Sequence, residues 1–389
     1  MQFFKRKNVN SDRCFCLRIG VFCPTLNVYG GGEFVAATIA NILAHNNYDV
    51  IFLVNEEVNQ REIMKFFGKP LHPSIKVIVK SSMVQPRELL DFYQTIFRSY
   101  IFKLKCDVWI DAYSNRIFPW TNISYIHFPF LNHYFYKPKF PYIKSRQLIP
   151  IGGLPYAFIE RNFTSDDGKL ILANSRYTAE EIRKFSRKKT EVLYPPVPST
   201  HFNNSSEDLI KNQRKNLVVT ISRFSPGKGL EKIPYIASLT EPHIQFAVIG
   251  RVHYPQTLLS LKRLTKKLDL TEKIKFFPDS SRIEMKKILK NAKIYLHTMV
   301  GEHFGISIVE GMAMGCIPIV HNSGGAKEFV PSELRYNNIY EAAAKITRET
   351  HEWTPQKAAK IIKIAERFRE ENFSKEFMKL FEQYIENKF

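Results

Sequence analysis

The sequence contains few cysteines: there are five among 389 residues, at positions 14, 16, 23, 106 and 316. Their odd number and wide spacing are unlike a disulfide framework and favour a reducing compartment. Cys14 and Cys16 have no further Cys or His nearby that could complete a metal site, so we interpret them as residues at a strand edge. The patterns DxD and HExxH are also absent, and no metal site is predicted.

Long apolar runs are missing too. No run approaches the ~20 residues that a membrane-spanning helix needs. The first residues, MQFFKRKN, lack the apolar core of a signal peptide. We therefore expect a protein that is soluble or attached peripherally to a membrane.

Acidic residues are in the minority. The chain has 57 Lys and Arg against 37 Asp and Glu, which gives a net charge of +20 spread over both halves. Such an excess suits an anionic surface, an anionic substrate or RNA, whereas a basic tail would concentrate the charge.

Residues 112–159 contain no acidic side chain. This span combines cations with many aromatic residues, among them Lys137, Tyr134 and Tyr136. The mixture suits a membrane interface, where rings and cations meet anionic lipid headgroups. It also suits single-stranded nucleic acid, and a packed strand followed by a loop would explain part of it.

Short apolar runs alternate with helical patterns along the chain, which predicts two α/β domains with parallel sheets. In the first half, strands are expected at 17–24, 49–54, 106–112, 123–129 and 169–175. In the second half they are expected at 216–221, 244–250, 273–277, 293–297 and 316–321. Helices are expected at 33–45, 86–104, 354–371 and 374–388.

The prolines of 193–200 indicate a stiff connection between the domains. We therefore place an N-terminal Rossmann-like domain at 1–195 and a C-terminal one at 196–372, followed by a C-terminal helix at 373–389. Two such domains face each other across a cleft, and ligands of parallel sheets bind beyond the carboxyl ends of the strands.

The segment GEHFGISIVE carries two glutamates, Glu302 and Glu310, eight positions apart. A helix is expected to begin near Phe304 or Gly305, and its free N–H groups could hold a phosphate. Glu302 would then lie beside that phosphate, and Glu310, two turns into the helix, could accept hydrogen bonds from a ribose. The alternative is that Glu310 pairs with a Lys or Arg in the core.

Three further segments follow predicted strands. The loop SRFSPGKG carries Arg223 and Lys228, a plausible diphosphate clamp or a solvated basic loop. YGGGE, with Gly31 and Gly32, could bring backbone close to an anion or form a plain tight turn. HNSGG, with Gly324, could do the same or form an ordinary turn.

His127 lies at the carboxyl end of the strand predicted at 123–129. From there it could hydrogen-bond a sugar or another hydroxyl group in the cleft. A purely structural histidine is an equally open interpretation.

Taken together, these motifs resemble the retaining, metal-independent glycosyltransferases of family 4, which have the GT-B fold. The resemblance covers both domains and is most specific at 296–330. There, EHFGISIVEGMAMGCIPIVHNSGG looks closest to α-1,2-mannosyltransferases that extend a lipid-diphosphate-linked oligosaccharide on the cytosolic side of a membrane. YIHFP and GGGE, at 125–129 and 30–33, look similar to the same subfamily.

The resemblance implies a role for each site residue. Glu302 would hold hydroxyls of the donor sugar and Glu310 those of the ribose, while His127 would contact donor sugar or acceptor. Arg223 and Lys228 would stabilise the leaving diphosphate, to which Gly305, Ile306 and Ser307 would offer backbone N–H groups.

The resemblance also implies the reaction and its setting. A hexose, mannose from GDP-mannose, would move onto a lipid-linked glycan in glycoconjugate assembly or protein N-glycosylation. The nucleotide sugar is a substrate, and no cofactor is expected. We expect a cytoplasmic protein, peripheral on an anionic membrane surface, with no nucleic-acid partner.

Other functions remain open from the sequence. One is a soluble glycosyltransferase of the sucrose- or starch-synthase type. From a different class, the charge allows a basic RNA-binding protein or a membrane scaffold. No RNP, KH, zinc-finger or helix-turn-helix pattern supports nucleic-acid binding, and neither alternative explains Glu310.

Overall fold

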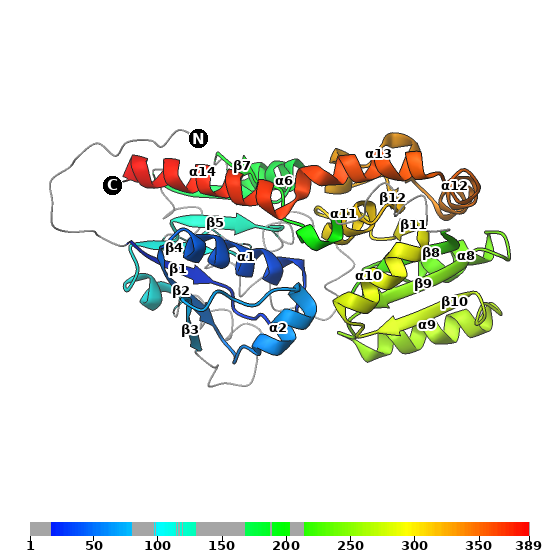
Figure 1. Ribbon diagram of the computed structural model, residues 1–389, viewed down its shortest axis with the longest axis horizontal. Coiled ribbons are helices and arrows are strands. Elements are labelled where there is room, and N and C mark those ends of the chain that lie inside the picture. The colour runs from blue at the N-terminus through cyan, green and yellow to red at the C-terminus, as the bar shows by residue number, and fades with distance from the viewer. Residues whose placement is uncertain are drawn as a thin grey trace.

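The protein consists of two α/β lobes, each built on one parallel sheet (Figure 1). This computed structural model describes residues 17–79, 97, 99–113, 115, 117–118, 120–129, 168–186, 189–202 and 214–388. Most of the basic, aromatic span 112–159, the pair Cys14 and Cys16, and most of the helix expected at 86–104 lie outside the described residues. Within them, no helix is both long enough and apolar enough to cross a bilayer.

The N-terminal sheet has the strand order β3-β2-β1-β4-β5-β6-β7, and all its pairs are parallel. Its strands are β1 Arg18–Phe22, β2 Asp49–Val54, β3 Lys76–Val79, β4 Val108–Asp111, β5 Ile123–Ile126, β6 Leu170–Ala173 and β7 Glu191–Val192. Its helices are α1 Gly31–His45, α2 Gln60–Phe67 and α6 Arg176–Ser186.

The C-terminal sheet repeats this plan with the order β10-β9-β8-β11-β12-β13. Its strands are β8 Lys215–Ile221, β9 Gln245–Gly250, β10 Ile274–Pro278, β11 Ala292–His297, β12 Ile317–His321 and β13 Arg335–Tyr336. The helices around it are α8 Lys232–Ser238, α9 Pro255–Lys267, α10 Arg282–Asn291, α11 Ile306–Ala313, α12 Ile339–His351 and α13 Pro355–Ala365. Short 3₁₀ turns are η2 Ser199–Phe202, η3 Gly325–Glu328, η4 Ser332–Leu334 and η5 Glu366–Phe368.

Both sheets have the doubly wound order, in which the chain reverses direction at the first strand of each sheet. The predicted fold class, two Rossmann-like domains of the GT-B type, is confirmed. Each predicted strand coincides with an observed one to within a few residues. The short edge strands β3, β7 and β13 were not predicted.

The helix expected at 354–371 is wrong as a single helix. It divides into α13 and the turn η5, and Arg369 is extended. Arg369 forms a bridge with Val197 in the connection between the lobes, which a continuous helix would prevent. α14 Glu370–Lys388 then returns to the N-terminal lobe and runs beside α1 (Figure 1). Its Phe373, Phe377 and Phe381 are buried in the N-terminal core.

Candidate active site

A cleft of about 520 Å³ lies between the two lobes, and it brings together nearly every predicted site residue. From the N-terminal lobe it is lined by Gly31, Gly32 and His127. From the C-terminal lobe it is lined by Arg223, Lys228, Glu302, Phe304, Gly305, Ile306, Ser307 and Glu310. These segments follow the carboxyl ends of parallel strands. The topology alone therefore places them at the carboxyl edge of each sheet, where the two lobes face each other.

Two helix N-termini meet in this cleft. α1 begins at Gly31, two residues earlier than the sequence indicates, so Gly31 and Gly32 form its first turn rather than a loop. A Cβ on Gly31 would lie 2.7 Å from Ile306 Cδ1, at the start of α11. Each helix start carries free N–H groups and a positive partial charge, so the space between them favours an anion.

Gly305 precedes α11 with a φ of +96°, a conformation that glycine adopts readily and other residues rarely do. A Cβ there would lie 2.4 Å from Ile308 Cδ1. Gly324, in contrast, does not line the cleft. With a φ of +73°, it packs against the backbone of Glu302, where a Cβ would lie 2.2 Å from the carbonyl oxygen. It therefore supports the Glu302 loop from behind.

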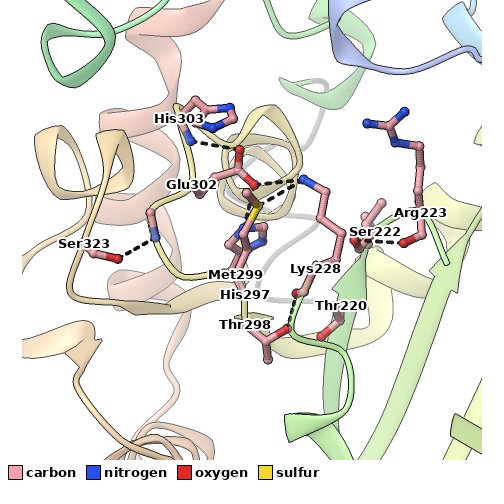
Figure 2. A network of polar contacts seen from close by, with 12 residues as sticks. Thr220, Ser222, Arg223, Lys228, His297, Thr298, Met299, Glu302, His303 and Ser323 are labelled. Atoms are coloured by element: carbon pink, nitrogen blue, oxygen red, sulfur yellow. Dashed lines mark hydrogen bonds and ion pairs between the residues drawn. The ribbon is translucent and has the colours of Figure 1, made fainter. Parts of the chain in front are cut away.

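Glu302 is the centre of a polar network (Figure 2). Its Oε2 lies 3.0 Å from Nε2 of His297 and 3.4 Å from Nζ of Lys228. Its Oε1 accepts the backbone N–H of His303 at 3.1 Å. Burial raises the pKa of Glu302, but Lys228 and His297 outweigh this effect, so its pKa lies well below the ordinary value.

The loop after β8 supplies the two predicted cations. Lys228 reaches Glu302 and lies 3.2 Å from the Met299 sulfur. Arg223 is exposed, and its guanidinium extends away from Lys228 (Figure 2). One cation is thus held beside the carboxylate, and the second lines the cleft without contacting that carboxylate.

Glu310 is 6% exposed and pairs with Arg282, whose Nη1 lies 2.9 Å from Oε1 of the glutamate. The Nε of Arg282 also donates to the carbonyl oxygen of Phe66 at 2.7 Å, in the opposite lobe. Glu310 therefore pairs with a cation in the core, which was the alternative left open by the sequence. Both side chains of the pair nevertheless line the cleft.

The N-terminal wall carries Glu33 and His127. Glu33 is 2% exposed; its Oε2 accepts the N–H of Gly30 at 3.0 Å, and Tyr113 lies beside it. Burial raises the pKa of Glu33, and Arg223 partly opposes this. The Nε2 of His127 lies 3.3 Å from the Ala112 carbonyl oxygen, and burial lowers its pKa to about 4, so the imidazole is neutral at pH 7.

Sequence reasoning missed Arg282, His297 and Glu33. His297 ends β11 just as His127 follows β5, so the argument used for His127 would have found it. Glu33 was visible in GGGE. The pairing of Arg282 with Glu310, 28 residues away, has no signal in a single sequence.

Comparisons with known proteins bear on the family and on the fold. Residues 201–367 match the family model described as glycosyl transferases group 1. The chain is 28% identical over 243 residues to the GDP-Man:Man(3)GlcNAc(2)-PP-Dol alpha-1,2-mannosyltransferase of Dictyostelium discoideum, covering 56% of this chain and 48% of that protein. The human protein of the same name is 26% identical over 366 residues, covering 79% of this chain and 73% of that protein.

Among solved structures, sucrose-phosphate synthase from Thermosynechococcus elongatus superposes with a TM-score of 0.72 at 15% identity. The superposition covers 96% of this chain and all of that one, 100%. At such identity the likeness concerns the fold alone, and it extends over both lobes.

Proposed function

We propose that this protein moves mannose from GDP-mannose onto a lipid-linked glycan, because it has the GT-B fold and its residues 201–367 match the group 1 glycosyl transferases. The observation that carries the proposal is the ionised Glu302, held by Lys228 and His297 at the start of α11. The acceptor class comes from the names of the relatives in Dictyostelium and human.

The donor binds against the C-terminal wall in this proposal. Its diphosphate lies between the starts of α1 and α11, where Arg223 and Lys228 supply positive charge. Glu302 accepts hydrogen bonds from hydroxyls of the sugar, and Glu310 reaches those of the ribose. Charge accumulates on the diphosphate in the transition state, so cations and N–H groups already in place lower the barrier.

The acceptor approaches from the N-terminal wall. The bond between the sugar and the phosphate breaks, the acceptor oxygen bonds the same sugar carbon, and the acceptor proton passes to a phosphate oxygen. The neutral His127 orients a hydroxyl without adding a second charge. Chemistry of this kind needs no cofactor besides the nucleotide sugar.

A thermal-unfolding experiment tests the nucleotide site first. We expect GDP at about 100 times its Kd to stabilise the wild type by about 2.7 kcal/mol, and Glu310→Ala to lose most of this shift. Glu272→Ala, an exposed glutamate in the same lobe, serves as the matched control and should respond like the wild type.

A transfer assay then separates the acceptors. Mannose from GDP-mannose should appear on a lipid-diphosphate oligosaccharide and not on a water-soluble sugar phosphate. Transfer from a UDP-sugar to a soluble sugar phosphate would instead favour the sucrose-synthase type, and tight RNA binding with no nucleotide response would contradict an enzyme altogether.

We also propose that the N-terminal lobe contacts the cytoplasmic face of an anionic membrane. The helical residues 97 and 99–103, with the residue after them, expose four apolar side chains by 38% to 66%. These are Phe97, Tyr100, Ile101 and Leu104, at helical spacing of three and four. Lys103 and Lys105 flank this apolar face, and the net charge of +20 favours anionic headgroups.

Sedimentation with vesicles tests the membrane contact. The wild type should bind phosphatidylserine vesicles more strongly than phosphatidylcholine vesicles, and Phe97→Ser with Leu104→Ser should weaken binding. Tyr340→Ser, which removes an equally exposed apolar ring from the other lobe, is the control. Equal binding by both variants would contradict this surface.

A further inference from the structure

We propose that Glu241, His243 and His351 form a site for a divalent transition-metal ion of the zinc type, remote from the cleft. Glu241 and His243 lie in the turn between α8 and β9, and His351 is the last residue of α12. Among the described residues, this is the one group of three such side chains whose potential ligand atoms all lie within 4.8 Å of one another.

Both imidazoles approach the same carboxylate oxygen. The Oε2 of Glu241 lies 2.7 Å from Nε2 of His351 and 3.4 Å from Nε2 of His243, and the two rings are 5.8 Å apart. Three ligands at ~2.0–2.2 Å from a tetrahedral zinc ion lie ~3.3 Å from one another. The shorter contact, at 2.7 Å, therefore has to open by about 0.6 Å.

The exposed positions permit this movement. The side chains of Glu241, His243 and His351 are 42%, 49% and 55% exposed, so they have room to adjust and an ion can enter directly from solvent. Water would complete the coordination. Two imidazoles and one carboxylate suit zinc and its neighbours in the first transition row, whereas magnesium and calcium prefer sets of oxygen ligands alone.

The position indicates what the ion would do. The turn at Glu241 precedes β9, so it lies at the amino ends of the strands, opposite the edge that carries the cleft. His351 is 110 positions further along the chain. A bound ion would join α12 to the α8–β9 turn and would stabilise the folded C-terminal lobe, without taking part in transfer chemistry.

Cobalt and zinc titrations of the metal-free, reduced protein test the site. We expect one ion per chain, and a Co²⁺ spectrum with visible d–d bands but no intense sulfur-to-metal band in the near ultraviolet. His243→Gln and His351→Gln should each weaken zinc binding by at least ~10-fold, because even neighbours of metal ligands change affinity by that much. Thermal unfolding should rise with zinc in the wild type and not in these variants.

His72→Gln is the matched control, since His45 and His72 also form a ring pair, with centroids 4.6 Å apart. It should bind zinc like the wild type. Absence of stoichiometric binding, a sulfur band, or equal zinc affinity in the wild type and both His243→Gln and His351→Gln would overturn the proposal.

Discussion

The two walls of the cleft differ in whether their titratable side chains are charged. On the C-terminal wall, Lys228 and His297 hold Glu302 in its charged form, with a pKa well below the ordinary value. On the N-terminal wall, burial moves Glu33 and His127 toward their uncharged forms. The C-terminal wall thus keeps its groups charged, and its cations Arg223 and Lys228 suit an anionic ligand such as a nucleotide diphosphate. The N-terminal wall suits a neutral, hydroxyl-rich ligand.

Exchanging one carboxylate on each wall is the strongest test of this contrast. Glu302→Gln should lower kcat/KM by about 10²–10³-fold, equivalent to about 3–4 kcal/mol, because its charge is part of the prepared electrostatic site. Glu33→Gln should cost less, because the amide oxygen can still accept the N–H of Gly30. Transfer kinetics with purified variants measure both, and a larger loss in Glu33→Gln would reverse the assignment of the walls.

The contacts of Arg282, which join the two walls, should have a smaller effect than Glu302. Arg282→Ala leaves Glu310 buried without its cation and removes the donor to the Phe66 carbonyl oxygen, so we expect a loss of about 2–3 kcal/mol in the free energy of unfolding. Urea unfolding measures this loss. Lys287→Ala, which removes an exposed cation from the same helix α10, should change stability by less than about 0.5 kcal/mol. Equal losses in both variants would show that the contacts of Arg282 do not stabilise the fold.

Each lobe contains a buried histidine with a lowered pKa, so stability should depend on pH. Burial lowers the pKa of His127 and of His201, in η2, to about 4. Because these values lie below that of an unfolded histidine, stability is complete above about pH 6.5 and falls as the pH drops toward 4.

Each of these histidines should account for about 2 kcal/mol of the loss by pH 4.5. Urea unfolding of His201→Gln between pH 7.5 and 4.5 should therefore show a shallower dependence on pH than the wild type. A slope identical to that of the wild type would mean that folding does not lower the pKa of His201.

The smallest expected effect concerns Tyr113, which lies beside Glu33. Tyr113→Phe removes a hydroxyl group that helps to lower the pKa of Glu33, so this pKa should rise. We expect a change of less than about 1 kcal/mol in stability. The KM for the acceptor should rise, and the KM for the nucleotide sugar should stay unchanged. A changed donor KM alone would place Tyr113 with the other wall.

Much of this architecture could be predicted from the sequence because buried parallel strands are nearly continuous apolar runs. The edge strand β3 escaped because it is short and partly exposed, and β7 and β13 have only two residues each. The start of α1 was missed because glycine is a poor helix former, and here tertiary contacts with Ile306 outweigh that preference.

The candidate site divides in the same way. Residues that follow strands, such as Lys228 and Glu302, could be placed in the cleft from topology alone. The partner of Glu310 could not, because Arg282 reaches it from α10 through a contact that depends on how the elements pack. The sequence therefore predicted where the cleft lies. The structure was needed to show which charged side chains in it are already paired with one another.

The return of α14 has a consequence for the order of events during synthesis. Phe377 and Phe381 are completely buried in the N-terminal core, and the Tyr384 hydroxyl accepts a hydrogen bond from Asn122, 262 positions earlier. Domains usually fold as the ribosome releases them. Here the N-terminal lobe leaves the ribosome first, yet one face of its core remains open to chaperones until α14 emerges, so the lobe translated first is the last to be completed.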